Sequence, residues 1–367
     1  MLKNPPLRIL LISGSFPPMK CGVGDYTRRL AESLGEQPDV AVGVLSREEA
    51  GALQGPRRYE LYPVVKSWRM GDLPRVVRTI RHFRPDIVHI QHPGQGYVGH
   101  LLPTLIPLIS RAAGAHAVQT WHEYYPKIGI VQTLNAMATD KIIVVRPDFV
   151  EKLPASSRGL IPRREFRFIR NGSSIPAVRL TAPERESIAR KYAPAGRNLV
   201  VHFGFVAPHK GTDRIFDIAD PETDHLVIAS DLSADDPFQA SVRTRSGSPP
   251  WSGKTTITGF LPEEELARLL AAADAVVFPY RTGGGLWNTS IHGATVQGTF
   301  VLATSTDRSG YDPARNICFT EPDNLEEMRA ALKSRKGTRL EVPGETDDWK
   351  SISEEHIRVY RRALGAS

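Results

Sequence analysis

Short apolar runs of strand length alternate with helix-like patterns along this chain, and that alternation limits the fold more than any other feature. Typical runs are RILLIS, DIVHIQ and HAVQTW in the first half, and LVVHFGF, HLVIAS and AVVFPY in the second. They are almost continuous in apolar residues, as strands are when helices cover both faces of a parallel sheet. We therefore predict an α/β protein built from doubly wound sheets with crossover helices.

The strands fall into two series, separated by the breaker-rich segment NGSSIPAVRLTAPERES. A chain of 367 residues is long enough for two domains, each with its own core. We predict a Rossmann-like domain over residues 1–174, a second over residues 175–345, and a final helix within residues 346–367. The helix is indicated by DDWKSISEEHIRVYRRAL, which mixes charged and apolar residues.

Charge is spread unevenly along the chain. Residues 1–175 hold 24 Lys/Arg against 14 Asp/Glu, and the rest of the chain holds 23 against 26. This asymmetry predicts an anionic partner for the first domain, such as a membrane surface, with ordinary solvated helix faces as the equal alternative. RVVRTIRHFR, which repeats Arg75, Arg78 and Arg81 along one helix face, and PRREFRFIR are the best candidates for that contact. No nucleic-acid motif accompanies them, so we do not expect nucleic acid as a partner.

The chain has the composition of a soluble globular protein, and no apolar run approaches the roughly 20 residues that span a bilayer. The start of the sequence does not match a signal peptide. Two widely separated cysteines, Cys21 and Cys318, fit a reducing compartment. We expect a cytoplasmic protein, with a peripheral position at the inner face of the membrane as an alternative.

Ligands of open α/β sheets bind at the carboxyl ends of strands, and one such end leads into FPYRTGGGLWNTSIHGATVQG. A glycine-rich loop followed by a helix that Asn288, Thr289 or Ser290 can cap presents unpaired N–H groups to an anion. The alternative is a tight turn without a ligand. We favour the anion site, because three successive glycines, Gly283 to Gly285, exceed what a turn needs.

Other strand ends carry further candidates. Lys210 in VAPHKG is a point charge suited to a diphosphate. In CGVGDYTRR, Gly22 and Gly24 would let a loop close over a ligand, and His122 in TWHEYYP follows a strand end. No metal-ligand spacing occurs at any strand end, so we predict no metal and no other cofactor.

Taken in order, these loops resemble the retaining glycosyltransferases of the GT-B fold, specifically glycosyltransferase family 4. The resemblance covers essentially the whole chain and rests on FPPMKCGVGDYTRRLAESL, WHE, IRNGSSIP, FGFVAPHKG, ITGFLPEEELARLLAAADAVVFPY and GTFVLAT. It implies two Rossmann-like domains that face a central cleft. The first would hold the acceptor and the second a nucleotide-sugar donor, with the last helix crossing back to the first domain. It further implies a metal-independent enzyme that transfers a sugar with retention of anomeric configuration.

The resemblance also implies roles for individual residues. The donor diphosphate would lie between Lys210 and the loop amides, while the donor phosphate itself takes the acceptor proton. The predicted amide donors are Gly284, Gly285, Leu286, Trp287, Asn288, Thr289 and Ser290. His122 would orient the sugar, Gly22 and Gly24 would approach the diphosphate, and Asn171 and Gly172 would form the hinge. The acceptor would be a glycan, a lipid-linked sugar or a small molecule.

The chain departs from the family at three positions. Many members carry two glutamates with seven residues between them, and the corresponding positions here are Gly285 and Gly293. A basic residue that often stands five positions before the lysine is replaced by Phe205. These differences leave the sugar and the nucleotide open. They also leave open an alternative function, a catalytically inactive nucleotide-sugar-binding or regulatory protein.

Overall fold

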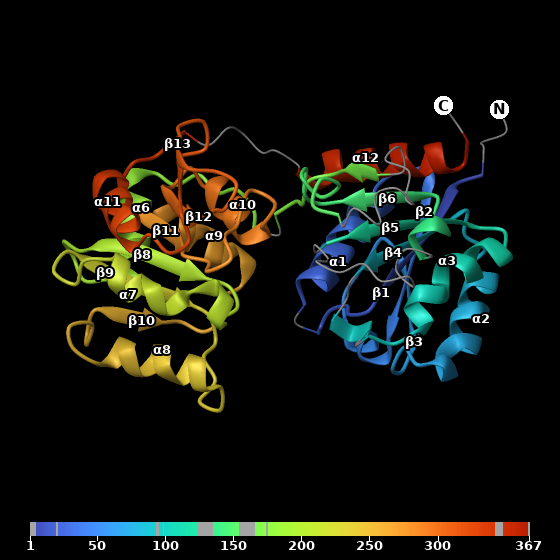
Figure 1. The fold of residues 1–367 in the computed structure, drawn as a ribbon, viewed down its shortest axis with the longest axis horizontal. Helices are drawn as coiled ribbons and strands as arrows, with labels where there is room; N and C mark the ends of the chain where they lie inside the picture. Colours follow the sequence, from blue (N-terminus) through green and yellow to red (C-terminus); the bar gives the residue numbers. More distant parts are fainter. Residues whose placement is uncertain are drawn as a thin grey trace. The chain divides into compact units, whose positions relative to one another are not determined.

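The computed structural model describes residues 5–19, 21–92, 95–97, 99–122, 135–153, 166–173, 175–341 and 348–365. The chain divides into two compact units (Figure 1). Unit 1 comprises Met1–Gly172 with Asp347–Ser367, and unit 2 comprises Ser173–Thr346. Ser174, at the end of the first predicted domain, lies outside the described residues. Each unit is a parallel-dominated sheet with helices, so the predicted α/β fold class is confirmed.

Unit 1 is built on a sheet of seven parallel strands in the order β3-β2-β1-β4-β5-β6-β7. The strands are β1 (Leu7–Ser13), β2 (Val40–Arg47), β3 (Glu60–Val65), β4 (Ile87–His92), β5 (His116–Trp121), β6 (Lys141–Val144) and β7 (Phe166–Phe168). The central strands are fully buried because helices cover both faces of the sheet.

The helices of unit 1 form two layers around separate cores (Figure 1). They are α1 (Gly22–Gly35), α2 (Leu73–Phe83), α3 (Leu102–Ala112) and α12 (Asp348–Ala363). On one face of the sheet, α2 and α3 contribute apolar side chains to the same core cluster. On the other face, α1 packs against α12, so the last helix of the chain belongs to unit 1.

Unit 2 has a second seven-stranded sheet, in the order β10-β9-β8-β11-β12-β14-β13, in which only β13 runs antiparallel to its neighbour. Its strands are β8 (Asn198–Phe203), β9 (Asp224–Ala229), β10 (Thr255–Ile257), β11 (Ala275–Phe278), β12 (Val301–Thr304), β13 (Gly310–Asp312) and β14 (Ile317–Thr320). The reversal of strand order at β8 and β11 is the place where open α/β sheets bind ligands.

Helices also cover both faces of the second sheet. They are α6 (Ala182–Tyr192), α7 (Ile215–Ile218), α8 (Pro237–Gly247), α9 (Glu263–Ala272), α10 (Thr289–Thr295) and α11 (Leu325–Arg335). One core takes side chains from α6, α9 and α10, and the other from α7, α8 and α11. The predicted linker is shorter than expected, because Thr181 and Glu184 form a capping box that starts α6 inside it.

Candidate functional site

The loop between β11 and α10 carries the glycine triplet. Gly283 has a φ of +72°, and a Cβ there would lie 2.9 Å from the amide nitrogen of Thr306. A Cβ on Gly284 would lie 2.9 Å from side-chain atoms of both Tyr280 and Ile291. The packing of the loop against its own unit therefore accounts for these glycines. Packing within unit 2 is sufficient to explain the three glycines, so they do not by themselves indicate a ligand, and the anion site stays a prediction.

The two positions where the family resemblance places glutamates have no room for a side chain. A Cβ on Gly285 would overlap the ring of Trp287. A Cβ on Gly293, in α10, would lie 2.9 Å from both Ser173 Oγ and Ile175 Cδ1. Other side chains therefore occupy the space of the missing carboxylates. The Trp287 indole lies beside Gly285, and Ser173 and Ile175 lie beside Gly293.

Several of the predicted amide donors already have protein acceptors. The Gly284 amide donates to the Thr304 carbonyl at 2.7 Å, and the Gly285 amide donates to Asn288 Oδ1 at 2.9 Å. The Asn288 amide donates back to the Gly285 carbonyl at 2.9 Å. For the amides of Leu286, Thr289 and Ser290, the part of the chain that the structure describes provides no acceptor. These three amides remain as candidate donors to an anion.

Lys210 lies in a short 3-10 turn, Pro208–Lys210, that follows β8. The turn continues through Gly211, whose φ is +62° and whose missing Cβ leaves room for the Pro279 carbonyl. The Lys210 Nζ lies 4.2 Å from the centroid of the buried Tyr280 ring. The Tyr280 hydroxyl hydrogen-bonds in turn to the side chain of Ser290. The structure therefore brings Lys210 over the ring of the tyrosine whose hydroxyl contacts the start of α10.

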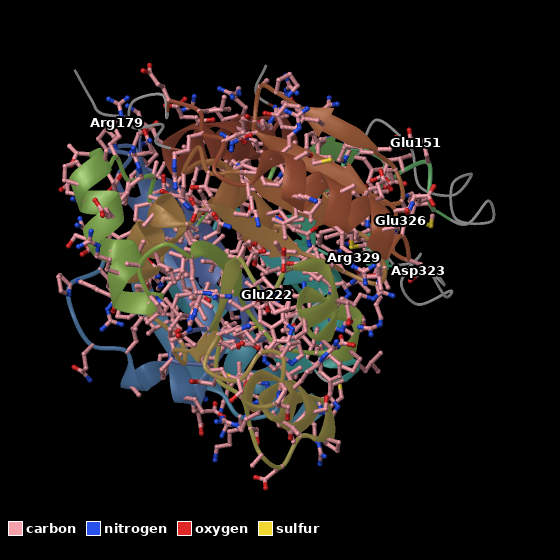
Figure 2. All side chains as sticks on the ribbon, turned by 90° about the vertical axis from the view of Figure 1, so that its left-hand side faces the viewer. Glu151, Arg179, Glu222, Asp323, Glu326 and Arg329 are labelled. Carbon is pink, nitrogen blue, oxygen red and sulfur yellow. The ribbon has the colours of Figure 1, made fainter. Side chains whose placement is uncertain are left out.

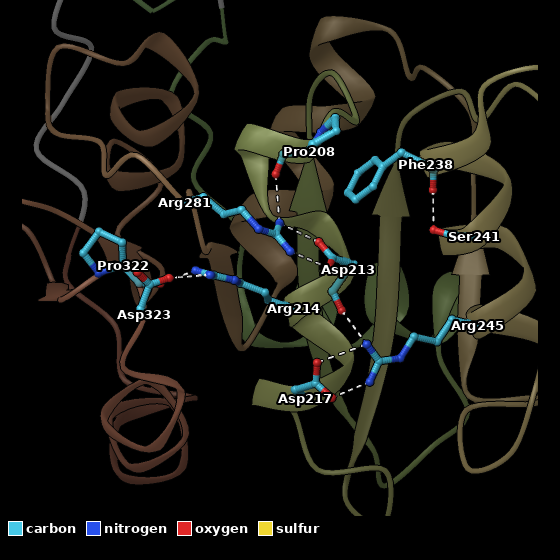
Figure 3. Close-up of polar contacts among 10 residues, drawn as sticks. All are labelled: Pro208, Asp213, Arg214, Asp217, Phe238, Ser241, Arg245, Arg281, Pro322 and Asp323. Atoms are coloured by element: carbon cyan, nitrogen blue, oxygen red, sulfur yellow. Dashed lines mark hydrogen bonds and ion pairs between the residues drawn. The ribbon is translucent and has the colours of Figure 1, made fainter.

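Arg281 joins the glycine-rich loop to the turn that carries Lys210 (Figure 3). Its backbone amide donates to the His209 carbonyl at 2.9 Å, and its guanidinium donates to the Pro208 carbonyl at 2.8 Å. The guanidinium also donates to both Asp213 carboxylate oxygens, at 2.9 and 2.7 Å. Burial alone would raise the Asp213 pKa, but the hydrogen bonds and charge of Arg281 outweigh it and lower that pKa. We call this set of contacts the Arg281 clamp. No local sequence pattern indicates this clamp, because Arg281 and Asp213 lie 68 residues apart in the chain.

Three further arginines hold the helices behind the clamp. Arg245 of α8 pairs through two nitrogens with Asp217 of α7, and Arg214 pairs with Asp323 (Figure 3). Arg329 donates to the Asp217 carbonyl at 2.5 Å, and it lies near Asp323 at the start of α11 (Figure 2). These contacts fasten α7, α8 and α11 to one another.

Two exposed aromatic rings lie at the same edge of the sheet as the Lys210 turn. Phe205 follows β8 and Phe260 follows β10, and the side chains are 52% and 40% exposed. Their ring centroids are 5.6 Å apart in an edge-to-face arrangement. The Phe260 amide donates to Asp231 Oδ1 at 3.3 Å, just beyond the end of β9. An exposed apolar pair at a ligand-binding edge is a candidate contact for a flat ligand.

His122 directly follows β5 in unit 1 and is partly buried. Its Nε2 lies 2.8 Å from Gln91 Oε1, an acceptor, so Nε2 carries the proton. Its ring also meets the Tyr26 ring edge-to-face, with centroids 4.7 Å apart. Burial, followed by the nearby imidazoles of His356 and His92, lowers the pKa of His122 to about 3. His122 is therefore neutral near pH 7. The rest of the TWHEYYP motif, residues 123–126, lies outside the described residues.

A chain of buried hydrogen bonds links His122 to the last helix of the protein. The Gln91 amide nitrogen lies 3.3 Å from His89 Nε2, and His89 Nδ1 lies 2.7 Å from the Tyr360 hydroxyl of α12. Thr120 Oγ1 completes the partners of His89 at 2.7 Å. His122 could be predicted from its place at a strand end. The residues that support it could not, because Tyr360 lies 271 positions from His89 in the chain.

The remaining predicted residues fall in two places in unit 1. Gly24 is in the first turn of α1, where a Cβ would lie 3.0 Å from the Ser15 carbonyl oxygen, whereas a Cβ on Gly22 would meet nothing within 4 Å. Gly24 is thus explained by close packing, and only Gly22 leaves open space. Gly172, which closes unit 1 after Asn171, packs against the α12 side chains Ile352 and Trp349. The hinge role of Asn171 and Gly172 stays a prediction.

Within the described residues, no group of three or more His, Cys, Asp or Glu side chains is arranged to hold a metal ion. None of the helices that the structure describes is both long enough and apolar enough to cross a bilayer.

Comparison with known proteins connects these features to a family. Residues 21–175 match Glycosyltransferase Family 4. A GDP-mannose-dependent alpha-mannosyltransferase of Mycobacterium tuberculosis is 23% identical over 305 residues, which is 74% of this chain and 72% of the relative.

Solved structures match the fold over nearly the whole chain. Sucrose-phosphate synthase from Thermosynechococcus elongatus superposes with a TM-score of 0.73 at 17% identity, over 98% of this chain and 100% of the other. Anabaena HepE in complex with UDP and glucose superposes with a TM-score of 0.65 at 13% identity, over 98% of both chains. Together with the two doubly wound sheets, these matches identify a glycosyltransferase of the GT-B fold, in which residues 21–175 are similar to glycosyltransferase family 4.

Proposed function

We propose that unit 2 binds the diphosphate of a nucleotide-sugar donor between Lys210 and the start of α10, and that unit 1 provides the acceptor site. The observation that carries this proposal is the placement of Lys210 over the ring of Tyr280, whose hydroxyl hydrogen-bonds to Ser290. A fixed cation and unpaired helix-start amides then lie at the carboxyl edge of one sheet, at the strand-order reversal between β8 and β11.

The chemistry follows from where charge develops. As the bond between the anomeric carbon and the diphosphate oxygen breaks, both of its electrons go to the diphosphate. An acceptor hydroxyl oxygen bonds to that carbon on the same face, and its proton passes to a phosphate oxygen of the donor. Lys210 and the amides of Leu286, Thr289 and Ser290 stabilise the growing negative charge, without a metal ion. Sugar transfer then retains the anomeric configuration.

His122 acts in this proposal as a positioning group for the transferred sugar. A histidine with a pKa of about 3 is a poor general acid at neutral pH, because almost none of it is protonated. Its Nε2 proton is directed to Gln91, which leaves Nδ1 as an acceptor for a sugar hydroxyl. The ring is held in that tautomer by the hydrogen bonds that continue to His89 and Tyr360.

We further propose that the donor base stacks on the Phe205–Phe260 pair. The pair lies in the loops that follow β8 and β10, at the same edge of the sheet as the Lys210 turn, and offers an exposed aromatic surface. Without glutamates at Gly285 and Gly293, sugar and ribose would be held by hydroxyls and by the Trp287 indole, which fills the first of these positions. The mycobacterial relative uses GDP-mannose, and HepE is seen with UDP and glucose, so guanosine and uridine donors should be tested first.

The test is a donor-binding assay on three variants. Lys210→Ala is expected to weaken nucleoside diphosphate binding about ten- to hundredfold, because it removes a charge-assisted hydrogen bond. Thr289→Trp should block the same site by bulk. Lys333→Ala, an exposed lysine of α11, is the matched control and should bind normally. Unchanged affinity in both site variants would refute the diphosphate position. Release of nucleoside diphosphate from a donor in the presence of acceptor separates an active transferase from an inactive binding protein.

A further inference from the structure

We propose that the outer face of helices α2 and α3 in unit 1 docks on an anionic lipid surface. This face is defined by Arg78 and Arg81 of α2, Leu108 of α3, and Leu101 at the start of α3. Docking through this face does not depend on where the donor binds in unit 2.

The two helices present one continuous layer. Val76 and Ile80 of α2 share a core cluster with Leu102 and Ile106 of α3, so both helices cover the same face of the first sheet. They also contact each other directly, and Figure 1 shows them side by side. Because their inner stripes point into one core, their outer stripes point away from the sheet together.

The outer stripe of α3 is apolar. Leu108 is 56% exposed, more than any other large hydrophobic side chain in the described part of the chain, and Leu101 is 52% exposed. They stand seven residues apart, which places them two turns apart along the same side of the helix. Two leucines aligned on an exposed helix face are suited to the boundary between headgroups and acyl chains.

The outer stripe of α2 is positively charged. Arg78 and Arg81 are exposed, and neither forms an ion pair with a described carboxylate. The predicted face also included Arg75, but that side chain pairs with the buried Asp72 at 2.8 Å and is not available. Neither α2 nor α3 contains an aspartate or glutamate.

The opposite layer of unit 1 has a different character. Helix α12 mixes Glu354 and Glu355 with Arg358 and Arg362, so that layer carries charges of both signs. A layer with exposed leucines, unpaired arginines and no acidic residue complements an anionic bilayer, whereas a mixed layer does not. The charge pattern therefore assigns the membrane contact to the α2–α3 face.

The experiment is co-sedimentation of the full chain with vesicles of phosphatidylglycerol and phosphatidylcholine, compared with vesicles of phosphatidylcholine alone. The wild type is expected to bind the anionic vesicles preferentially. The variant Arg78→Gln/Arg81→Gln should partition about 25-fold more weakly, since each arginine near an anionic surface contributes about fivefold. The matched control Arg358→Gln/Arg362→Gln, on the exposed face of α12, should partition like the wild type.

A salt series and a second variant separate the two contributions. High salt should remove the part of the binding that depends on the arginines, while Leu108→Gln should weaken binding at low and high salt alike. Equal losses in the α2 and α12 variants, equal binding to neutral vesicles, or no binding to either vesicle would overturn the proposal. A dimer in ultracentrifugation that Leu108→Gln dissociates would instead assign the face to a second copy of the chain.

Donor binding is measured on the same variants, so that the two proposals can fail separately. The α2 variant should retain normal affinity for nucleoside diphosphate. A chain that binds vesicles but no diphosphate refutes the donor site alone, and a chain that binds diphosphate but no vesicles refutes the docking face alone.

Discussion

The Arg281 clamp leads to the sharpest prediction. Arg281→Lys keeps the positive charge, but a single ammonium cannot reproduce the fork that reaches both oxygens of Asp213 together with the Pro208 carbonyl. The turn that carries Lys210 then loses its tie to the glycine-rich loop. We expect Lys210 to move away from the position that contacts phosphate, even though Lys210 itself is unchanged.

The size of the effect follows from what Lys210 is proposed to contribute. A hydrogen bond to a charged group contributes about 1.5–3 kcal/mol, so Arg281→Lys should raise the Kd for nucleoside diphosphate by up to about ten- to hundredfold. The loss should not exceed that of Lys210→Ala. Affinity for the corresponding nucleoside, which has no phosphate, should stay within about twofold because the Phe205–Phe260 pair is untouched.

The assay is calorimetric or thermal-shift titration with nucleoside diphosphate and with nucleoside, on four proteins. They are the wild type, Arg281→Lys, Lys210→Ala and the double variant. Because both substitutions act through Lys210, the double variant should bind no more weakly than Lys210→Ala alone. Additive losses in the double variant would refute the argument that Arg281 acts by placing Lys210.

Arg245→Lys is the matched control. Arg245 also makes a two-nitrogen pair with an aspartate, Asp217, and it donates to the Asp213 carbonyl at 3.0 Å. Its hydrogen bonds reach neither the Asp213 carboxylate nor the Pro208–Lys210 turn. Comparable stability losses in Arg281→Lys and Arg245→Lys, with weakened diphosphate binding only in the first, are expected. If both variants lost affinity equally, the effect would be general loosening of unit 2.

Three further predictions concern other features of the two units. Gly285→Ala should destabilise the protein by about 1–3 kcal/mol through overlap with the Trp287 ring, and Gly285→Ala/Trp287→Ala should destabilise it less than the sum of the single variants, as measured by urea unfolding. Phe260→Ala should weaken nucleoside and nucleoside diphosphate binding alike by about tenfold, whereas a loss confined to the diphosphate would exclude base stacking. Burial holds the pKa of four unit 1 histidines, His89, His92, His122 and His356, below the usual 6.5, so the unfolded chain takes up protons first as pH falls below that value. Above pH 6.5 these histidines leave stability unchanged, because they are neutral in the folded and the unfolded chain. Between pH 6.5 and about 4 the free energy of unfolding falls by about 1.4 kcal/mol per histidine per pH unit. In the described part of unit 2, burial lowers the pKa of two histidines, His202 and His225. Hydrogen exchange corrected for its intrinsic pH dependence should therefore show unit 1 losing protection before unit 2, and the reverse order would contradict this assignment.

Most of the strands that the sequence predicted are largely buried, although the partly buried edge strand β10 was predicted as well. Continuous apolar runs such as Leu10–Ile12 and Val276–Phe278 are buried on both faces of their sheet, and such runs predict central strands. The strands it missed are β3, β7 and β13, at the edges of the two sheets. The strands β7 and β13 have only three residues each, which is too short to show a periodic signal.

From the sequence, only those site residues that directly follow a strand could be predicted. The positions of Lys210 and His122 follow from the rule that ligands gather at the carboxyl ends of parallel strands. The groups that fix their geometry, Arg281 with Asp213 and Gln91 with His89, are joined through space by folding, and neither local spacing nor composition reveals such pairs. The glycine triplet shows a third limit: a sequence can indicate that a side chain is excluded without showing whether a ligand or the protein excludes it.

The indole that fills the space beside Gly285 has a consequence for how donor preference can change. A glutamate at position 285 requires the Trp287 ring to move, and the loss of Trp287 alone leaves a hole and no new ligand contact. We therefore expect Gly285→Glu and the replacement of Trp287 to be harmful singly and useful only together. An exchange of this loop for a glutamate-bearing one by single mutations would then pass through a less stable variant. Libraries that seek a new donor sugar should vary these two positions jointly, and pair Gly293 with Ile175 for the same reason.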